Sequence, residues 1–169
     1  MSTVDAPITT DAGTGFLSEG ELAVIRHEVT HYENARAACI GALKAVQEAR
    51  GWVPDAAIPA IAAELGITAA DVEGVATFYS MIFRHPVGRH VIKVCDSIAC
   101  YLTGYDELLA AIHSATGLDW GQTGADGRFT LLPVCCLGNC DKAPSLMIDD
   151  DTWGPVDPAE IPELLERYR

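Results

Sequence analysis

The sequence has few basic residues for its length. Lysine and arginine account for 11 of 169 residues against 24 aspartates and glutamates, so the formal net charge at pH 7 is −13. Because nucleic acid and anionic lipid attract basic protein surfaces, this balance argues against both as direct partners. It is compatible with a basic partner surface, with burial in a larger assembly, or with a solvated acidic face.

Long hydrophobic runs are also missing. No stretch approaches the roughly 18 consecutive apolar residues that indicate a transmembrane helix. The N-terminal segment has neither a basic region nor an apolar run, which is unlike a signal peptide. We therefore expect a cytoplasmic protein without membrane insertion, in which the six cysteines are thiols or metal ligands and not disulfides.

Nucleotide-binding motifs are a third absence. Neither G-x-G-x-x-G nor a Walker sequence occurs, so no glycine-rich loop is available to bind the phosphates of a nucleotide. If NADH takes part in the function, we expect another subunit to hold it.

The hydrophobic pattern divides the sequence into three segments. Residues 1–17 have no periodicity and are rich in small and polar residues, which is typical of a mobile tail. Residues 18–85 contain four short amphipathic helical stretches with short connections, which predicts an antiparallel helical bundle. From residue 86 to 169 short strands alternate with helices, which predicts a small two-layer unit. The expected fold class is therefore α/β (α+β).

Local signals mark the ends of these elements. Ser18-x-x-Glu21 and Thr68-x-x-Asp71 are capping-box signatures at the starts of the first and fourth predicted helices. Beyond residue 86 the predicted order is β-α-β-β-β-α. The first strand ends at Cys95, a helix spans about residues 104–115, and strands follow at about 129–134, 146–148 and 153–156, before a C-terminal helix.

Four cysteines occur in two pairs, Cys95-x4-Cys100 and Cys136-x3-Cys140. We expect the first pair on the loop leaving the first strand and the second pair on the loop leaving a neighbouring strand. Four thiolates from two loops form the ligand set of a [2Fe–2S] cluster, a one-electron carrier. The prediction is that all four bind such a cluster. Gly138 would let the second loop bend so that backbone N–H groups face sulfur.

Other uses of the cysteines remain open. Structural zinc usually takes Cys-x2-Cys spacings, so the longer spacings favour the cluster over zinc, free thiols or disulfides. Cys135 and Cys136 are adjacent and would point to opposite faces of a strand, so only one can face the site. The spacing through Gly138 favours Cys136 as the ligand and places Cys135 in the core. Cys39 shares a helical face with Leu43 and is expected to be a packed structural thiol.

A competing motif lies in the first predicted helix. His27-Glu28-Val29-Thr30-His31 matches the zinc-peptidase pattern H-E-x-x-H. A catalytic zinc also needs a third protein ligand. No G-x-x-H continuation follows, the next histidine is His85, and Glu48 would have to serve. A solvated polar face is the favoured interpretation, with a zinc peptidase as the alternative.

The segment Cys136-Leu-Gly-Asn-Cys140-Asp-Lys-Ala-Pro144, together with the earlier cysteine pair, resembles the thioredoxin-like [2Fe–2S] subunit of bacterial respiratory complex I, a family also described as the 24-kDa type. Residues 50–54, 72–79, 86–90 and 161–168 are similar as well, so the resemblance runs from about residue 18 to the C-terminus. It implies a helical bundle followed by a thioredoxin-like [2Fe–2S] ferredoxin domain, with Cys95, Cys100, Cys136 and Cys140 as cluster ligands. It also makes Pro144 the candidate for a cis peptide bond.

The resemblance further implies an electron-transfer subunit of NADH:quinone oxidoreductase (complex I) that is not itself catalytic. Its partner would be the flavin subunit, which holds FMN and NADH in the peripheral arm at the cytoplasmic face of the inner membrane. The cluster would store an electron temporarily near FMN. Related subunits in NAD-linked formate dehydrogenases and NAD-reducing hydrogenases leave the parent complex open. Asp96 and Asp141 flank ligands and only Lys142 offsets them, which predicts a low reduction potential.

Overall fold

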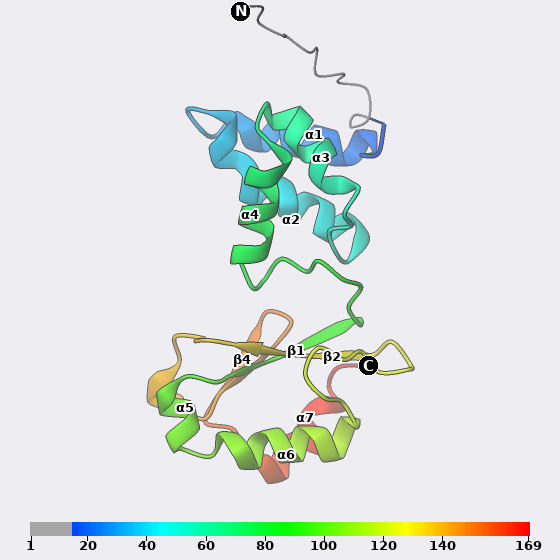
Figure 1. Ribbon diagram of the computed structural model, residues 1–169. Helices are drawn as coiled ribbons and strands as arrows, with labels where there is room; N and C mark the ends of the chain where they lie inside the picture. Colours follow the sequence, from blue (N-terminus) through cyan, green and yellow to red (C-terminus); the bar gives the residue numbers. More distant parts are fainter. Residues whose placement is uncertain (1–14) are drawn as a thin grey trace, which may run out of the picture. The chain divides into compact units, whose positions relative to one another are not determined.

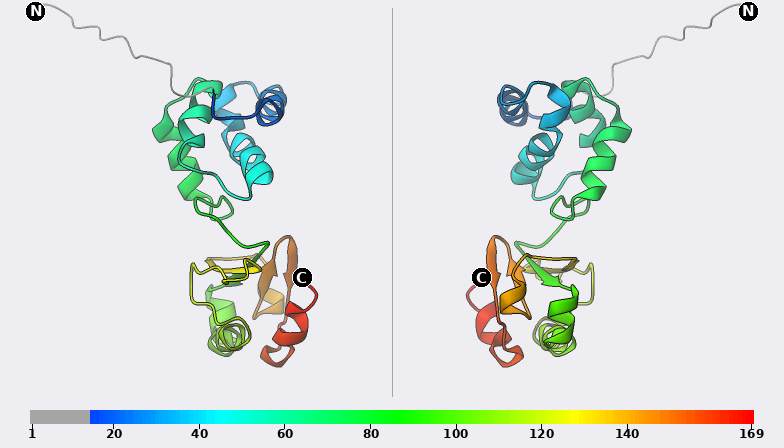
Figure 2. Two further views of the ribbon diagram at one scale, coloured as in Figure 1. Left: turned by 90° about the vertical axis from the view of Figure 1, so that its right-hand side faces the viewer. Right: turned by 90° about the vertical axis from the view of Figure 1, so that its left-hand side faces the viewer.

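A computed structural model describes residues 15–169. The predicted tail lies outside the described residues as far as residue 14. The chain forms two compact units, one ending at Pro86 and one beginning at Val87 (Figures 1 and 2). The division into one domain at residues 18–85 and a second at residues 86–169 stays a prediction. Across residues 15–169, no helix has both the length and the hydrophobicity to cross a membrane.

The first unit is helical (Figure 1). Its elements are α1 (Glu19–Val29), the 3₁₀ helix η1 (Ala35–Ala38), α2 (Cys39–Arg50), α3 (Ala57–Leu65) and α4 (Ala69–Phe78). Helix α1 packs on α2, and α3 packs on α4.

Both predicted capping boxes are confirmed. The Ser18 hydroxyl accepts the Glu21 N–H at 3.2 Å, while the Glu21 carboxylate accepts the Ser18 N–H at 2.7 Å. Thr68 and Asp71 make the same reciprocal pair at the start of α4. Each box satisfies backbone donors that the first helical turn leaves without a partner. At the C-terminal end of α2, Gly51 adopts a left-handed φ of 82°, a conformation that costs glycine little.

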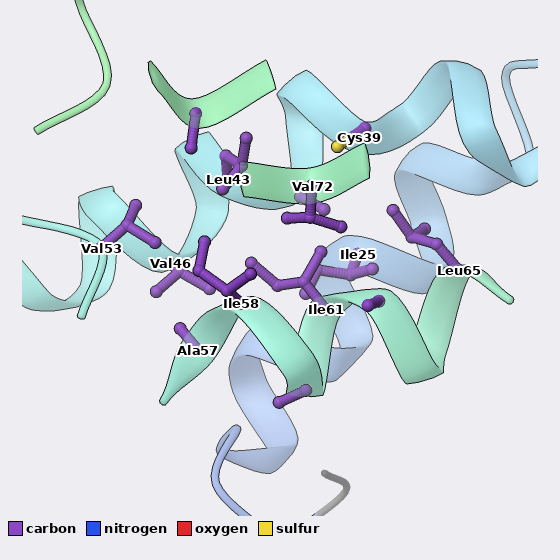
Figure 3. Close-up of a cluster of buried hydrophobic side chains, with 14 of the residues drawn as sticks. Ile25, Cys39, Leu43, Val46, Val53, Ala57, Ile58, Ile61, Leu65 and Val72 are labelled. Carbon is purple, nitrogen blue, oxygen red and sulfur yellow. The ribbon is translucent and has the colours of Figure 1, made fainter. Parts of the chain in front are cut away.

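One hydrophobic core holds the helices of the first unit together. Ile25, Leu43, Ile61 and Val72 come from α1, α2, α3 and α4 and are fully buried. Figure 3 shows these side chains converging between the helices. Cys39 is 3% exposed in the same core, so the prediction of a packed structural thiol is confirmed. Burial of these aliphatic side chains is the main favourable contribution to folding of this unit.

The second unit is a mixed sheet with helices. In chain order it contains β1 (His90–Cys95), α5 (Ile98–Leu102), α6 (Tyr105–Thr116), β2 (Phe129–Val134), η2 (Cys140–Lys142), β3 (Leu146–Ile148), β4 (Asp151–Trp153), η3 (Pro158–Glu160) and α7 (Ile161–Leu165). The strand order is β2-β1-β3-β4. Strand β1 runs parallel to β2 and antiparallel to β3, which pairs antiparallel with β4. The predicted α+β class is confirmed.

Helices α6 and α7 lie on the same face of the sheet (Figure 1). Ile112 of α6 and Ile161 of α7 are fully buried together with Ile92 of β1 and Leu131 of β2. The predicted order of strands and helices is present, with α5 as an additional element. The last strand covers Asp151–Trp153 and not 153–156, because its register places it opposite β3 and Pro155 has no N–H for a ladder.

Glu21 is the buried acid of the first unit. It is 4% exposed, and Arg50 donates to it from Nε at 2.5 Å and from Nη2 at 2.6 Å. The hydrogen bond from Arg50 is the largest influence and, with those from Ser18, lowers the pKa of Glu21 from 4.5 to about 2 against the opposing effect of burial. The folded state therefore holds this carboxylate in its charged form.

Glu21→Gln should destabilise the first unit at pH 7 by about 2–4 kcal/mol, because the folded pKa lies below the unfolded one. That contribution is fully present above about pH 4.5 and is lost as pH falls toward 2. Hydrogen-exchange mass spectrometry of peptides from α1 and α2 measures this loss of stability. The parent chain and Glu21→Gln are compared at pH 7 and at pH 3. Glu64→Gln, which breaks the exposed pair with Arg26, is the control and should cost less than about 1 kcal/mol. An unchanged gap between Glu21→Gln and the parent chain at pH 3 would contradict this assignment.

Candidate metal centre

The two cysteine pairs lie where the parallel strands β1 and β2 end. Cys95 is the last residue of β1 and stands opposite Val134, the last residue of β2. Cys136 lies in the loop that follows β2, and Cys140 begins η2. Parallel strands end at the same edge of a sheet, so their pairing brings together two segments that are far apart in the sequence.

Cys100 lies on a short helix and not on an irregular loop, which corrects the sequence-based expectation. It is the third residue of α5, a helix that begins after Ser97, whose carbonyl accepts the Tyr101 N–H at 2.9 Å. Residues 98–102 are too few for a periodic signal, so hydrophobic spacing could not reveal this turn. The turn returns Cys100 toward the end of β1.

The four thiols gather as two interacting pairs. Cys100 contributes to the raised pKa of Cys95, and Cys136 contributes to the raised pKa of Cys140, so each thiol interacts with the other member of its pair. The pairs are also close to each other, because charge on Cys100 raises the pKa of Cys140. The two pairs that the sequence singled out therefore lie within electrostatic range of each other.

The burial of the two pairs differs. Cys95 is 2% exposed and Cys100 is 1% exposed, whereas Cys136 and Cys140 are exposed. The site consequently has one face inside the protein and one face open to solvent.

Backbone N–H groups act on two of the sulfur atoms. The Gly138 N–H donates to Cys136 Sγ at 3.3 Å, and Gly138 has the left-handed φ of 74° that its sequence position suggested. The backbone N–H groups of Ser97 and Leu137 counteract part of the effect of burial on the pKa of Cys95. Leu137 belongs to the second cysteine segment, so part of that segment lies beside Cys95. Each such donor favours a negatively charged sulfur.

The protein alone opposes full ionisation of these thiols. Burial raises the pKa of Cys95, and repulsion from Cys136 raises the pKa of Cys140. Four thiolates side by side therefore require positive charge between them, which a metal ion or cluster supplies when it replaces the thiol protons. The donor set, its two-pair geometry and the N–H donors fit an iron–sulfur cluster.

Ser145 is a site residue that sequence reasoning missed. Its hydroxyl oxygen lies 3.5 Å from Cys100 Sγ. It follows Pro144, whose peptide bond with Ala143 is cis as predicted, and it immediately precedes β3. The only clue in the sequence is that Ser145 directly follows Pro144. The contact with Cys100 depends on how β3 pairs with β1, which the sequence does not show.

The expectation that Cys135 lies in the core is wrong. Cys135 is exposed, because β2 ends at Val134 and the alternation of inward and outward side chains stops before it.

The H-E-x-x-H segment is not on one continuous helix. Helix α1 ends at Val29, so His31 lies in the turn that follows. His27 and His31 are both exposed, which confirms the predicted polar face. Within residues 15–169, one group of three His, Cys, Asp or Glu side chains has its possible ligand atoms within 4.8 Å of one another. It consists of His27, Glu28 and His31. Neither His85 nor Glu48 joins that group.

Comparison with known proteins gives concordant matches. Residues 25–169 match the family described as thioredoxin-like [2Fe-2S] ferredoxin. A Pseudomonas aeruginosa protein, named as the E subunit of NADH-quinone oxidoreductase, is 65% identical over 152 residues, covering 90% of this chain and 92% of the relative. An Escherichia coli K12 protein of the same name is 62% identical over 153 residues, with the same two shares.

A solved structure has a similar fold over most of this chain. It is a crystal structure of an NAD+-reducing [NiFe]-hydrogenase, with a TM-score of 0.62 and 25% identity, and the match covers 75% of this chain. The match covers 22% of the hydrogenase chain, so most of that chain has no counterpart here.

Gly154→Ala should disturb the segment that carries Cys140 and Ser145. A Cβ on Gly154 would overlap the Lys142 carbonyl oxygen and lie 2.7 Å from Asn139 Nδ2. We expect a loss of about 1–3 kcal/mol in the free energy of unfolding, measured by urea denaturation. Alkylation of Cys95 and Cys100 in the metal-free chain should also become faster.

Gly74→Ala is the control for this substitution. Gly74 lies in α4 with open space around its Cα, so alanine there should be neutral or stabilise by up to about 1 kcal/mol. Unchanged unfolding and alkylation in Gly154→Ala would show that the crowding at this glycine has no structural consequence.

Proposed function

Because the chain belongs to the thioredoxin-like [2Fe–2S] ferredoxin family, we propose that Cys95, Cys100, Cys136 and Cys140 bind one [2Fe–2S] cluster and that the chain carries electrons. The observation that supports this most is the gathering of four thiols in two interacting pairs where β1 and β2 end. When bound, such a cluster supplies one-electron transfer. The chain contributes the ligands, the hydrogen bonds to sulfur and the exclusion of water from one side.

Each pair of cysteines is suited to bind one iron. Cys95 and Cys100 would bind the inner iron, because both are buried. Cys136 and Cys140 would bind the outer iron, because both are exposed. An electron-transfer partner can approach only the exposed side, since tunnelling requires proximity and the other side is covered by protein.

The charges around the site favour a low reduction potential. The oxidised site with four thiolates carries a formal charge of about −2, and Asp96 and Asp141 are exposed next to ligands. Lys142 is the one basic side chain in the same stretch. The N–H donors of Leu137 and Gly138 offset part of the repulsion. The added negative charge should still disfavour the reduced state relative to a neutral environment.

We propose NADH:quinone oxidoreductase as the parent complex, because relatives at 62–65% identity over 90% of this chain are named as a component of that enzyme. The hydrogenase match has only 25% identity. The partner would be the flavin subunit with FMN and NADH, in a peripheral arm at the cytoplasmic face of the membrane. The isolated chain should not oxidise NADH.

The anaerobically purified chain should contain about two iron and two sulfide per chain and give a rhombic EPR signal after dithionite. Serine at Cys95, Cys100, Cys136 or Cys140 should abolish or alter that signal. Cys135→Ser and Cys39→Ser are matched controls, because one is an exposed cysteine next to a ligand and the other is packed in the first unit. Both should retain full iron and the same signal.

Zinc without iron in chain isolated from its native host would overturn the electron-carrier proposal. The same native preparation tests the parent complex. Co-purification of an FMN-containing subunit with NADH:quinone activity supports the assignment. Co-purification of hydrogenase or formate dehydrogenase activity would replace it.

A further inference from the structure

Ser145 lies directly against the inner cysteine pair. Ser145 and Cys100 are each 1% exposed, and Ser145 Oγ is 3.5 Å from Cys100 Sγ. The Ser145 carbonyl also accepts the N–H of Cys95 at 3.2 Å. The serine is therefore held by its backbone to one buried ligand while its hydroxyl faces the other.

We propose that the Ser145 hydroxyl donates a hydrogen bond to the Cys100 sulfur and raises the reduction potential of the site. This rests on the proposed function. Between a hydroxyl and a thiol, either group can donate. Once Cys100 binds metal it has lost its proton, so only the hydroxyl can donate. The direction of the bond is then fixed toward sulfur.

The effect on the potential follows from charge. Reduction adds one electron to the site and moves no proton to Ser145, so the sulfur ligands become more negative. A hydrogen bond to a charged acceptor is stronger than one between neutral groups, and burial strengthens it further. Ser145 therefore stabilises the reduced state more than the oxidised state. Ser145 acts on the cluster through Cys100. It raises the reduction potential, whereas Asp96 and Asp141 lower it.

The test is an EPR-monitored redox titration of cluster-loaded full chain carrying Ser145→Ala. At a fixed ambient potential the ratio of reduced to oxidised sites should fall about three- to tenfold, where tenfold corresponds to 59 mV for a one-electron couple. Proton ENDOR of the variant should also show one strongly coupled exchangeable signal fewer than the parent chain, where exchangeable signals are those that disappear in D2O. Ser145→Thr keeps the hydroxyl and should restore both readouts.

Ser114→Ala is the matched control. It makes the same chemical change in the second unit, on α6, where Ser114 is exposed. Its potential should equal that of the parent chain. An unchanged potential in Ser145→Ala, or its failure to hold iron while Ser114→Ala loads fully, would overturn the role of Ser145. Absence of iron from the parent chain would instead overturn the proposed function.

A separate group of ligand atoms lies at the C-terminal end of α1. The ligand atoms of His27, Glu28 and His31 are within 4.8 Å of one another, and the imidazole centroids are 4.7 Å apart. The His31 N–H donates to the Glu28 carbonyl at 3.0 Å, which continues the helical turn beyond Val29. Glu28 packs over Gly41 of α2, where a Cβ would lie only 2.8 Å from Glu28 Oε2. The carboxylate therefore lies against α2 as well as beside the two imidazoles.

We infer that this group binds one divalent transition-metal ion of the Zn²⁺ type. Two imidazole nitrogens and one carboxylate oxygen suit such an ion, and water can complete the coordination because both histidines are exposed. The negative end of the α1 dipole also favours a cation there. With Glu28 as a ligand, no general base remains in the motif, so the site is a binding site and not a peptidase centre.

Calorimetric titration of Zn²⁺ into cluster-loaded full chain tests the site. One saturable site is expected, and affinity should fall as pH is lowered because protons compete for imidazole nitrogen. His27→Gln and His31→Gln should each weaken binding at least about tenfold. His113→Gln is the control, since His113 is exposed and bonds the Leu118 carbonyl in the second unit.

An unchanged visible spectrum during the titration shows that Zn²⁺ has not displaced iron at the cysteines. Equal binding by the parent chain and His27→Gln, or no saturable binding by the parent chain, would overturn the site.

Discussion

Parallel pairing of β1 with β2 is the constraint on which the site depends. The register aligns Cys95 with Val134, so both strands end together and deliver the two cysteine segments to the same edge of the sheet. The central position of β1 explains why this edge is well defined. It hydrogen bonds to β2 on one side and to β3 on the other, and Ser145 enters the site ahead of β3.

Electrostatic repulsion is the problem that this arrangement must solve. Burial raises the pKa of Cys95 and repulsion from Cys136 raises the pKa of Cys140, so positive charge between the sulfurs favours their ionised form. The backbone N–H groups of Ser97, Leu137 and Gly138 lower the cost for individual sulfurs. These groups stabilise negative charge on sulfur through the peptide dipole and need no charged side chain. The hydroxyl of Ser145 belongs to the same set of donors, on the face that water does not reach.

The first unit is stabilised differently, by an aliphatic core and by helix caps. Its buried ion pair of Glu21 and Arg50 connects the start of α1 to the end of α2. Ser18 donates to the same carboxylate, so one acid serves both the cap and the ion pair. The hydrogenase with a similar fold matches across 75% of this chain.

Features that rest on local chemistry could be predicted from the amino-acid sequence alone. Capping boxes at Ser18 and Thr68, the order of strands and helices, and the spacing of the two cysteine pairs are all written in neighbouring residues. Other features depend on how the chain packs. The Leu137 backbone acts on the pKa of Cys95, the Ser145 hydroxyl lies beside Cys100, and the Cys135 side chain is exposed to solvent. These depend on strand register and on where β2 stops, which no local pattern encodes.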